Sequence, residues 1–438
     1  MSAGGRLLIR GGRVIDPATG RDAVVDLLVV DRAVAMVGAG AADACGNAEV
    51  IDAAGLWVLP GLIDLHTHLR EPGYEYKETV LTGCRAAAAG GFTAVSCMPN
   101  TDPPNDSAAV TRAILRKADE ADLVRVYPIG CITAGQLGQR MAEFGDLVAA
   151  GCRAVSDDGR PVMNAGVMRR ALEYSRHFDI PVISHCEDLQ LAGDGVAHEG
   201  AVATRLGLKP IPAAAEEAMV AREVVLARQT GARVHIAHVS TRGSVALLAA
   251  AKAEGLTITA EATPHHLTLT DEAISGFDTS TKVNPPLRSE ADRAALCRAL
   301  AEGIIDAVAT DHAPHGLADK DLEFDAAANG LVGLETALPL ILGLVAAGAC
   351  PLHRAIDALT WSPARILGVP GGRLAVGDPA DIAIVDPNEE WTVDPEHFFT
   401  KGRNSPFRGW RLTGRVRATV VGGRIVFRDG AIVAAAQR

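Results

Sequence analysis

The chain alternates short apolar segments with helical ones eight times, and this alternation limits the folds that are open to it. The intervening segments, such as 213–228 and 293–302, are rich in Ala, Leu, Glu and Arg. Eight such units predict an α/β fold with a closed TIM-type (β/α)8 barrel rather than an open doubly wound sheet. The first strand-helix turn also lacks a glycine-rich dinucleotide fingerprint. The expected strands are residues 57–63, 93–99, 124–129, 153–157, 181–185, 233–238, 257–261 and 305–311.

Both ends of the chain differ in pattern from the middle. Short runs of Val, Ile and Leu broken by glycine occupy residues 1–57, and the same pattern returns in 381–385 and 417–426. Neither end can form a sizeable core alone, so we expect them to pair into one small composite β-sandwich. The predicted domains are residues 1–57 and 367–438 for the two parts of the sandwich and 58–366 for the barrel.

Composition excludes several classes of function. A formal net charge of −11 disfavours nonspecific binding to nucleic acid or to anionic membranes. The eight cysteines are scattered without a Cys-x-x-Cys pair, which fits a reduced cytosol better than a disulfide framework. The sequence shows neither an apolar signal core nor a membrane-spanning run. We expect a cytoplasmic, homo-oligomeric enzyme acting on a small molecule, with no nucleic-acid or membrane partner.

The first barrel strand runs into His66-Thr67-His68. In an extended segment, side chains two residues apart point the same way, so the two imidazoles aim at one place. One cation needs this arrangement from two histidine ligands. A His-x-His pair taken alone is more often two structural histidines, and the later strands decide between these interpretations.

Polar side chains also follow four later strands at their carboxyl ends, where TIM barrels form their active sites. Each alone can be a helix cap or a buried hydrogen-bonding group, but their convergence on one rim predicts a metal site. Nitrogen and oxygen ligands without sulfur favour zinc or another divalent transition metal over calcium or magnesium. The residues are Asp157 and Asp158 on the fourth strand, His185 on the fifth, His238 on the sixth and Asp311 on the eighth.

This set exceeds what one tetrahedral ion with an open position requires. It predicts two metals bridged by the carboxylate of the fourth strand and by a hydroxide, a nucleophile at neutral pH. Asp311 can bind one metal, accept the proton of the hydroxide and pass it to a leaving nitrogen. Neighbouring residues on a strand face opposite ways, so strand period alone leaves Asp157 and Asp158 as alternatives for the bridge.

Eight motifs run through the chain from the first barrel strand to the last. They are His66-Thr67-His68-Leu69-Arg70, Met98-Pro99-Asn100-Thr101, Ser156-Asp157-Asp158-Gly159, Ser184-His185-Cys186-Glu187, Ile236-Ala237-His238-Val239-Ser240, Thr263-Pro264-His265-His266-Leu267, Asn284-Pro285-Pro286-Leu287-Arg288 and Asp311-His312-Ala313-Pro314-His315. In this order they resemble the type I dihydroorotases of the amidohydrolase superfamily. The resemblance implies reversible cyclisation of N-carbamoyl-L-aspartate to L-dihydroorotate, the third step of de novo pyrimidine biosynthesis.

The resemblance also implies which residues hold the metals. It implies two Zn²⁺ per subunit, bridged by Asp158 and a hydroxide, and a catalytic role for Asp311. The other metal ligands that it implies are His66 and His68, which share one ion with Asp311, and His185 and His238, which hold the second ion.

Substrate recognition is implied in the same way. Arg70 can form a bidentate pair with a substrate carboxylate. The polar segment 315–330 mostly lacks helical or strand period, and we expect a mobile loop that closes over the site. This segment has Ala328-Asn329-Gly330 where many relatives have a Pro-Phe-Gly-like stretch. We therefore expect the main-chain groups of Asn329 and Gly330 to contact the substrate. The expected substrate-binding residues are Arg70, Asn100, Asn284, His315, Asn329 and Gly330.

Three alternatives remain at this point. Hydantoinases and allantoinases share the barrel and the metal pair, but they bridge the metals with a carboxylated lysine, and residues 118–208 contain no lysine. A single-metal deaminase of the same superfamily is disfavoured, because the carboxylate of the fourth strand would then have no second metal to bridge. A non-catalytic scaffold for aspartate transcarbamoylase is expected to lose metal ligands, whereas all six are present here. An active enzyme can still bind that transcarbamoylase as a partner.

Overall fold

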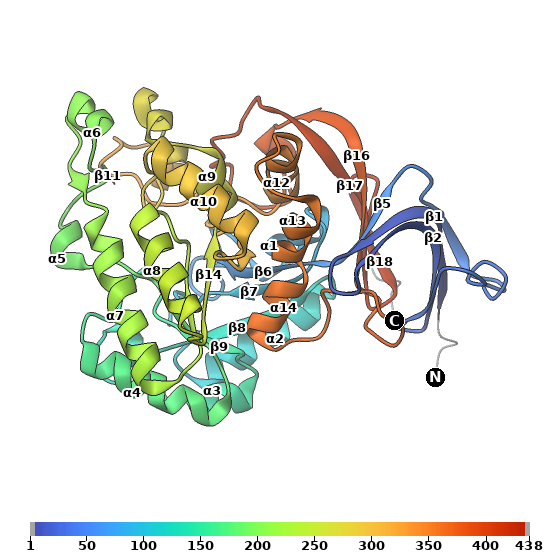
Figure 1. The fold of residues 1–438 in the computed structure, drawn as a ribbon, viewed down its shortest axis with the longest axis horizontal. Helices are drawn as coiled ribbons and strands as arrows, with labels where there is room; N and C mark the ends of the chain where they lie inside the picture. Colours follow the sequence, from blue (N-terminus) through green and yellow to red (C-terminus); the bar gives the residue numbers. More distant parts are fainter. Residues whose placement is uncertain (1–4, 434–438) are drawn as a thin grey trace.

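Eight parallel strands form a barrel in the middle of the chain (Figure 1). In the computed structural model, which describes residues 5–433, the strands neighbour one another in sequence order, and the predicted barrel is confirmed. All seven hydrogen-bonded pairs between neighbours are parallel. The strands are β6 (Leu62–Thr67), β7 (Phe92–Cys97), β8 (Arg125–Cys131), β9 (Ala154–Ser156), β10 (Val182–Ser184), β13 (Val234–Ile236), β14 (Ile258–Ala262) and β15 (Ala307–Val308).

A seam between the first and last strands closes the barrel. The His68 amide donates to the His312 carbonyl at 2.9 Å, just beyond the ends of β6 and β15. Inside the seam, the Asp64 carboxylate accepts from the Thr310 amide at 3.1 Å and from its hydroxyl at 2.6 Å. Asp64 is fully buried, and burial raises its pKa to about 7. This side chain therefore joins two strands from opposite ends of the barrel sequence.

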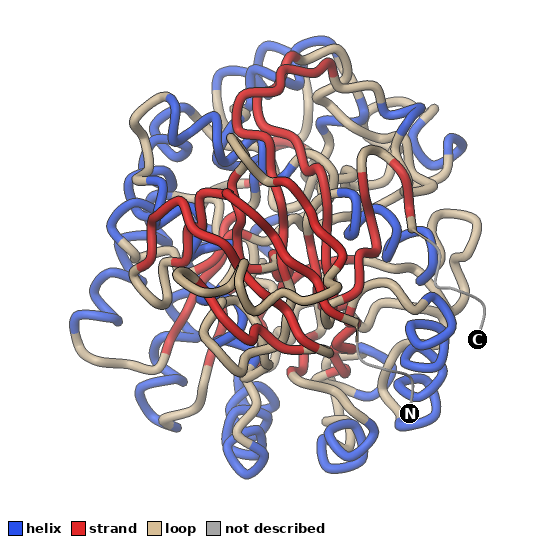
Figure 2. The backbone as a smooth tube through the Cα atoms, turned by 90° about the vertical axis from the view of Figure 1, so that its right-hand side faces the viewer, coloured by secondary structure: helices blue, strands red, loops and turns tan. Residues whose placement is uncertain are grey.

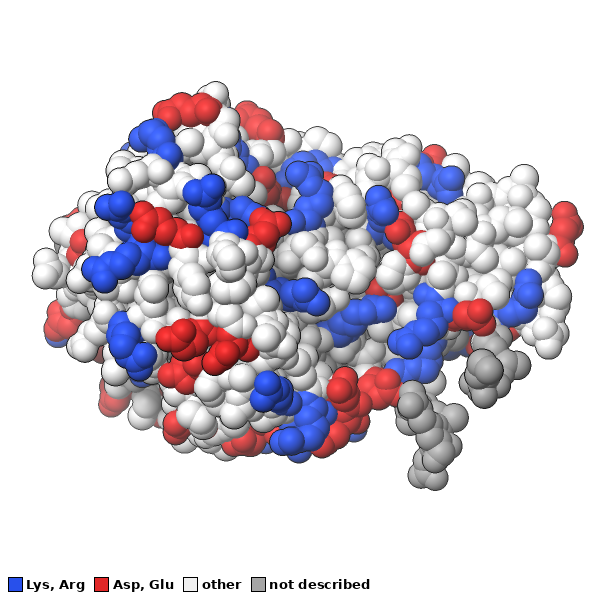
Figure 3. Space-filling view, turned by 90° about the horizontal axis from the view of Figure 1, so that it is seen from below, with Lys and Arg blue, Asp and Glu red and all other residues white. Residues whose placement is uncertain are grey.

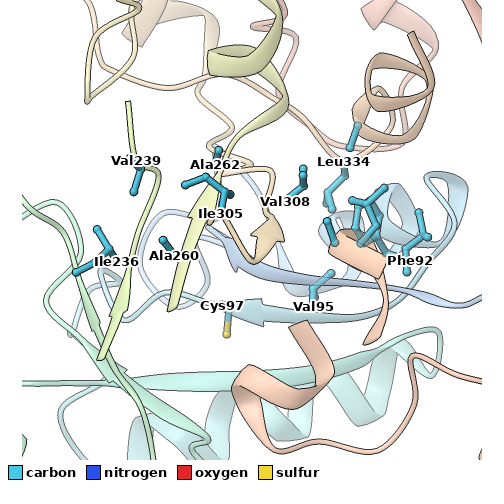
Figure 4. Packing of buried hydrophobic residues seen from close by; sticks show 14 of the residues in the cluster. Phe92, Val95, Cys97, Ile236, Val239, Ala260, Ala262, Ile305, Val308 and Leu334 are labelled. Atoms are coloured by element: carbon cyan, nitrogen blue, oxygen red, sulfur yellow. The ribbon is translucent and has the colours of Figure 1, made fainter. Parts of the chain in front are cut away.

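Helices surround the strands, as Figures 1 and 2 show. Strand side chains alternate between two apolar layers. In β7, Ala94 faces the barrel interior, whereas Val95 and Cys97 pack in the layer beneath the helices (Figure 4). The main helices are α1 (Val80–Ala89), α2 (Ala108–Ala121), α3 (Phe144–Ala150), α4 (Ala165–Ser175), α7 (Ala214–Thr230), α8 (Arg242–Ala253), α10 (Glu290–Glu302), α12 (Ala337–Ala346), α13 (Leu352–Leu359) and α14 (Trp361–Leu367).

Local sequence signals begin and end these helices. Ser289 precedes α10 and accepts from the Asp292 amide, and Gly303 ends the helix in the left-handed conformation. Helix α12 is apolar along its length, and most of its residues are buried. Within residues 5–433, no helix combines the length and the apolar character that crossing a membrane requires. On the face seen in Figure 3, acidic and basic side chains are interspersed.

Short elements decorate the loops at the carboxyl ends of the barrel strands. Among these short elements, the two strands at 197–198 and 210–211 pair with each other in a small parallel ribbon. The short elements are α5 (Leu189–Ala192), β11 (Ala197–His198), α6 (Ala201–Leu206), β12 (Pro210–Ile211), α9 (Pro264–Thr268) and α11 (Leu317–Lys320). These loops, which follow β10, β14 and β15, carry His185, Asn284, Asp311, His315, Asn329 and Gly330 of the predicted site residues.

The two ends of the chain share one nine-stranded sheet beside the barrel, which confirms the predicted composite domain (Figures 1 and 2). Its apolar core draws on both ends, for example Ile9 and Leu27 with Ile382 and Val420. The strands are β1 (Arg6–Asp16), β2 (Arg21–Val30), β3 (Ala33–Val37), β4 (Glu49–Asp52), β5 (Trp57–Pro60), β16 (Ile382–Thr392), β17 (Arg411–Val421), β18 (Arg424–Arg428) and β19 (Ala431–Ile432).

The apolar run 57–63, which we predict as one barrel strand, is divided at Gly61. Residues 57–60 form β5, which pairs with β1 and β16 in the terminal sheet, and the barrel begins with β6. A Cβ atom at Gly61 would lie 2.2 Å from the Thr93 side chain, so the chain passes this point only as glycine. The assignment of residues 58–60 to the barrel is therefore wrong. The apolar pattern continues without a break where the chain passes from the terminal sheet to the barrel, so the sequence does not mark the boundary.

Candidate metal centre

The structure brings the six predicted metal ligands together at the carboxyl ends of the barrel strands. They form two groups, and within each group the ligand atoms lie within 4.8 Å of one another. Asp158 belongs to both groups. All six side chains are buried. The first group contains His66, His68 and Asp158, the second contains Asp158, His185 and His238, and Asp311 lies beside the first.

The Asp158 carboxylate faces four imidazoles. Its Oδ1 atom lies 3.4 Å from His66 Nε2, 3.4 Å from His185 Nδ1 and 3.5 Å from His238 Nε2. Its Oδ2 atom lies 3.6 Å from His68 Nε2. Burial alone would raise the pKa of Asp158, but the histidines hold it well below its ordinary value. One carboxylate shared by two histidine pairs has the layout of a bridging ligand.

Asp311 reaches the first group from the opposite side of the seam. Its Oδ1 atom lies 2.9 Å from His68 Nε2 and 3.5 Å from His66 Nε2. Burial opposes ionisation, yet His66 and His68 keep the pKa of Asp311 below its ordinary value. The carboxylate is therefore ionised.

Strained backbone holds part of this rim in place. Arg70, His238 and Asp311 have φ angles of 62°, 32° and 48°, in the left-handed region that non-glycine residues seldom adopt. Such conformations cost about 1–3 kcal/mol each and persist where the surroundings enforce them. Strain at three rim residues is typical of a functional site.

The donor atoms fit a pair of divalent cations. His66 Nε2 and Asp158 Oδ1 are buried, and neither has a hydrogen-bond partner among the described residues. Such orphaned polar atoms are costly in a folded protein unless another group satisfies them. Imidazole nitrogens and carboxylate oxygens aimed at one place suit zinc and similar ions.

Asp157 turns away from this centre. Its carboxylate accepts from the Ile132 amide at 2.8 Å, the Thr133 amide at 3.1 Å and the Thr133 hydroxyl. It therefore stabilises the loop after β8. Of the two carboxylates that the sequence leaves open, only Asp158 faces the histidines.

The other ring nitrogen of three ligand histidines is also engaged. His66 Nδ1 lies 2.7 Å from Glu261 Oε1, and His68 Nδ1 lies 2.9 Å from Asn100 Oδ1. His185 Nε2 lies 3.3 Å from Glu187 Oε2. Acceptors on the far nitrogen fix the tautomer and orientation of a ligand histidine. Sequence reasoning missed both glutamates, although an acidic residue within the apolar strand β14 is a signal for Glu261.

The predicted substrate-binding residues lie around the same rim. Arg70 donates from Nε to the Pro314 carbonyl at 3.2 Å, and its Nη2 atom lies 3.4 Å from His315 Nε2. His315 Nε2 lies 2.8 Å from the Asn329 carbonyl. Gly330 has a φ of 127°, and a Cβ atom there would lie 2.6 Å from the Ala313 side chain. Arg70 and His315 therefore form one cluster with the 329–330 backbone.

Two predicted amides lie at opposite edges of the metal groups. Asn100 contacts His68, as described above. Asn284 donates from Nδ2 to Glu187 Oε2 at 3.1 Å, and the same oxygen contacts His185. Asn100 thus contacts a metal group directly, and Asn284 contacts the other through Glu187.

The segment 315–330 contains structure that the sequence does not predict. Residues 317–320 form helix α11, and two buried lysines hold the loop. Lys320 donates to the carbonyls of Thr279 at 2.8 Å and Ala328 at 2.6 Å. Lys282 donates to the Asp325 and Ala327 carbonyls, both at 2.8 Å. The loop is therefore held by lysine side chains that bind backbone carbonyls, and such contacts leave no periodic pattern in the sequence. The closing motion of the loop stays a prediction.

Asn404 is a further residue that sequence reasoning missed. It comes from the C-terminal part of the chain and is buried against the loop. Its Nδ2 atom donates to the Ala313 and Gly330 carbonyls, both at 3.0 Å, and its Oδ1 atom accepts from the His315 amide at 3.1 Å. Both edges of the loop are therefore tied to one amide. No motif near the barrel strands signals this contact.

Comparison with known proteins agrees with the fold. The family described as the amidohydrolase family matches residues 57–426. Among solved structures, the L-hydantoinase (dihydropyrimidinase) from Arthrobacter aurescens is similar with a TM-score of 0.88, 25% identity and coverage of 98% of this chain and 97% of that one. The D-hydantoinase (dihydropyrimidinase) from Thermus sp. has a TM-score of 0.83 and 26% identity, with coverage of 98% and 97%. The chain therefore belongs to the amidohydrolase family.

Curated sequences refine this assignment. A dihydroorotase of Anaeromyxobacter dehalogenans is 56% identical over 97% of this chain and 98% of its own length. A dihydroorotase of Pelotomaculum thermopropionicum is 56% identical over 98% and 100%, and one of Syntrophotalea carbinolica is 55% identical over 97% and 99%. These matches group the chain with the dihydroorotases, as the motifs predict.

Proposed function

We propose that the protein is a dihydroorotase, which interconverts N-carbamoyl-L-aspartate and L-dihydroorotate in de novo pyrimidine biosynthesis. The observation that carries the proposal is the position of Arg70, two residues beyond the His-x-His pair and beside His315. A cationic donor at the edge of a metal site suits a cyclic amide that bears its own carboxylate. The names of the curated relatives support the same activity.

We assign two Zn²⁺ ions per subunit to the two groups. When bound, such ions supply Lewis acidity and activate water at neutral pH. His66 and His68 would hold one ion together with Asp311, His185 and His238 would hold the other, and Asp158 would bridge them. The orphaned His66 Nε2 and Asp158 Oδ1 atoms support this assignment.

Asp311 is assigned the proton transfer. Its carboxylate takes a proton from the attacking water and delivers it to the ring nitrogen as the carbon–nitrogen bond breaks. In the direction of cyclisation, the same oxygen takes the proton from the carbamoyl nitrogen as this nitrogen attacks the carbon of the protonated carboxyl group. Asp311 then returns the proton to the hydroxyl of that carboxyl group as the carbon–oxygen bond breaks, and water leaves. Ionisation of the buried carboxylate, which the histidines favour, prepares it for this role.

Substrate binding is assigned to the cluster around Arg70. The guanidinium pairs with the substrate carboxylate, and Asn100 and His315 donate to it as well. Asn284 and the main chain of Asn329 and Gly330 contact the ring amide, which orients the scissile bond. A loop that closes over these groups would exclude water from the site.

We also propose the setting in which the enzyme works. The barrel carries the chemistry and the terminal sheet supports it, with the division now at residue 60. We propose a cytoplasmic homo-oligomer that acts on small molecules and can bind an aspartate transcarbamoylase. The scaffold alternative is weaker because no predicted metal ligand is lost.

Hydantoinase activity is the second candidate, because the similar solved structures are named hydantoinases. The absence of lysine between residues 118 and 208 argues against it. A steady-state assay of metal-loaded protein with dihydroorotate, hydantoin and allantoin separates the candidates. We expect about two zinc-like ions per chain and a clear preference for dihydroorotate. Inactivity toward dihydroorotate, both alone and with the transcarbamoylase, would overturn the proposal.

A further inference from the structure

Lys77 contacts the side of His315 that faces away from Asn329. Its Nζ atom lies 3.3 Å from His315 Nδ1, and His315 Nε2 lies 2.8 Å from the Asn329 carbonyl. A carbonyl only accepts and an ammonium group only donates. The contacts with Lys77 and Asn329 are satisfied together when His315 is neutral, with its proton on Nε2 and its lone pair on Nδ1. Arg70 Nη2, which also only donates, lies 3.4 Å from Nε2, so in this tautomer that approach is a contact between two donors and not a hydrogen bond.

Lys77 is itself held in place. Its ammonium group lies 5.7 Å from the centre of the Tyr74 ring and 5.4 Å from that of the Tyr76 ring, within the range of cation–π contacts. It also lies 3.5 Å from Asp319 Oδ1, and its side chain is only 15% exposed. Asp319 in turn accepts from the Gly316 amide at 2.9 Å. Lys77 therefore belongs to the rim and is not a solvated surface charge.

The charges around His315 keep the ring neutral. Burial, with the positive charges of Arg70, Lys77 and Lys320, lowers the pKa of His315 to about 2. Asp319 also faces it, 3.9 Å from Nδ1. A neutral ring has two tautomers, and only the one protonated on Nε2 is a donor beside the Arg70 guanidinium, 3.4 Å away.

We propose that Lys77 is a positioning residue that fixes the Nε2-protonated tautomer of His315. In this structure the Nε2–H donates to the Asn329 carbonyl. When substrate binds, its carboxylate takes the place of that carbonyl and accepts from this N–H and from the Arg70 guanidinium side by side. The proposal rests on the proposed function, because it requires a substrate that carries a carboxylate. Lys77 itself need not touch the substrate. It supports the three residues assigned to the substrate carboxylate, Arg70, Asn100 and His315, and its role is distinct from theirs.

Kinetics of Lys77→Met test the binding half of the proposal. The substitution keeps the length of the side chain and removes the donor. We expect KM for L-dihydroorotate to rise about tenfold, the loss expected for one hydrogen bond to a charged group, with kcat within about twofold. Lys77→Arg should recover most of the affinity. Lys401→Met is the matched control, because the Lys401 ammonium donates to the nearby Glu75 carbonyl instead.

Nitrogen NMR of ¹⁵N-histidine-labelled protein tests the tautomer without substrate or activity. His315→Gln identifies the His315 signals. We expect an unprotonated Nδ1 in the parent protein and a mixture of tautomers in Lys77→Met. Thermal melting checks that the variants fold, and Lys77→Gln replaces Lys77→Met if the latter unfolds.

The outcomes distinguish this proposal from the proposed function. A parent enzyme inactive on dihydroorotate contradicts the function, whereas the NMR result still reports on Lys77. An unchanged tautomer in Lys77→Met overturns the proposal even if KM rises, since Lys77 would then act through charge alone. An altered tautomer with an unchanged KM overturns the link to carboxylate binding.

Discussion

The Glu261 carboxylate lies 2.7 Å from Nδ1 of His66, while Nε2 of the same ring faces Asp158. Glu261 is fully buried within β14, and its second oxygen lies 3.1 Å from His235 Nε2. Burial opposes its ionisation, but the charges and hydrogen bonds of His66 and His235 lower the pKa of Glu261 to about 2. An ionised acceptor at this point orients the His66 ring and raises its basicity as a ligand.

Replacing Glu261 by Gln should therefore weaken metal binding. The amide keeps the shape but removes the charge, and we expect an affinity loss of about 10- to 100-fold. Zinc competition with a chelator measures the change. Glu254→Gln, which alters an exposed ion pair with Arg228, is the control. Equal zinc affinity in the Glu261 variant and the parent would contradict the role.

Asp158→Ala and Asp157→Ala should have opposite metal contents. Asp158 is common to both ligand groups, so its removal should deplete both ions. Asp157 binds the loop after β8, so its removal should lower Tm and leave metal content near that of the parent. Elemental analysis of both purified variants decides the matter. A greater loss of metal from the Asp157 variant would reverse the assignment.

Asp311→Asn should leave the fold intact and abolish turnover. The amide cannot accept the proton, and loss of a general base costs about 10²- to 10⁴-fold in rate. Circular dichroism checks the fold, metal analysis checks the centre, and a steady-state assay gives kcat. Near-normal turnover in a metal-loaded Asp311→Asn variant would exclude the proton-shuttle role.

Asn404→Ala should loosen the loop that carries His315 and Gly330. It leaves two buried carbonyls and one amide without their partner, and we expect a loss of about 1–3 kcal/mol in the free energy of unfolding. KM should also rise, because the loop contributes substrate contacts. Urea unfolding and steady-state kinetics measure the two effects. Asn388→Ala, in the exposed part of β16, is a matched control, and a KM equal to that of the control would argue against the loop contact.

Glu335→Gln should change how stability depends on pH. Glu335 accepts from the Phe399 amide at 2.8 Å and the Thr400 amide at 3.3 Å, and burial raises its pKa to about 8 from an ordinary 4.5. Its favourable contribution is fully present below pH 4.5 and is lost as pH rises through 8. Gln keeps both acceptor contacts and does not ionise. Thermal melts should therefore nearly coincide near pH 5, separate in favour of the variant between pH 5 and 8, and keep that difference above pH 8; a constant difference across the whole range would contradict the pKa.

The barrel could be predicted because its strands are short apolar runs that end in polar residues. His66 and His68 share a strand face by simple period, and Asp311 stands where a barrel strand must end. The choice between Asp157 and Asp158 could not be made from period, because the hydrogen bonds of Thr133 decide which carboxylate turns inward.

The contacts that the sequence did not reveal come from distant segments. Glu261 reaches His66 across 195 positions, and Asn404 reaches His315 across 89. Neither separation leaves a local pattern. The division at Gly61 was missed for a related reason, since the constraint there is the Thr93 side chain on the next strand.

The Asp64–Thr310 seam also orders events during synthesis. The two residues lie 246 positions apart, so the histidines of the first motif leave the ribosome long before the strand that completes their site. Until then β6 is an unpaired edge, open to wrong partners. Contacts of such long range form late in folding. A chain released before residue 311 would thus have an open sheet and an incomplete set of metal ligands. Stable metal binding would therefore show that the chain had been synthesised beyond residue 311.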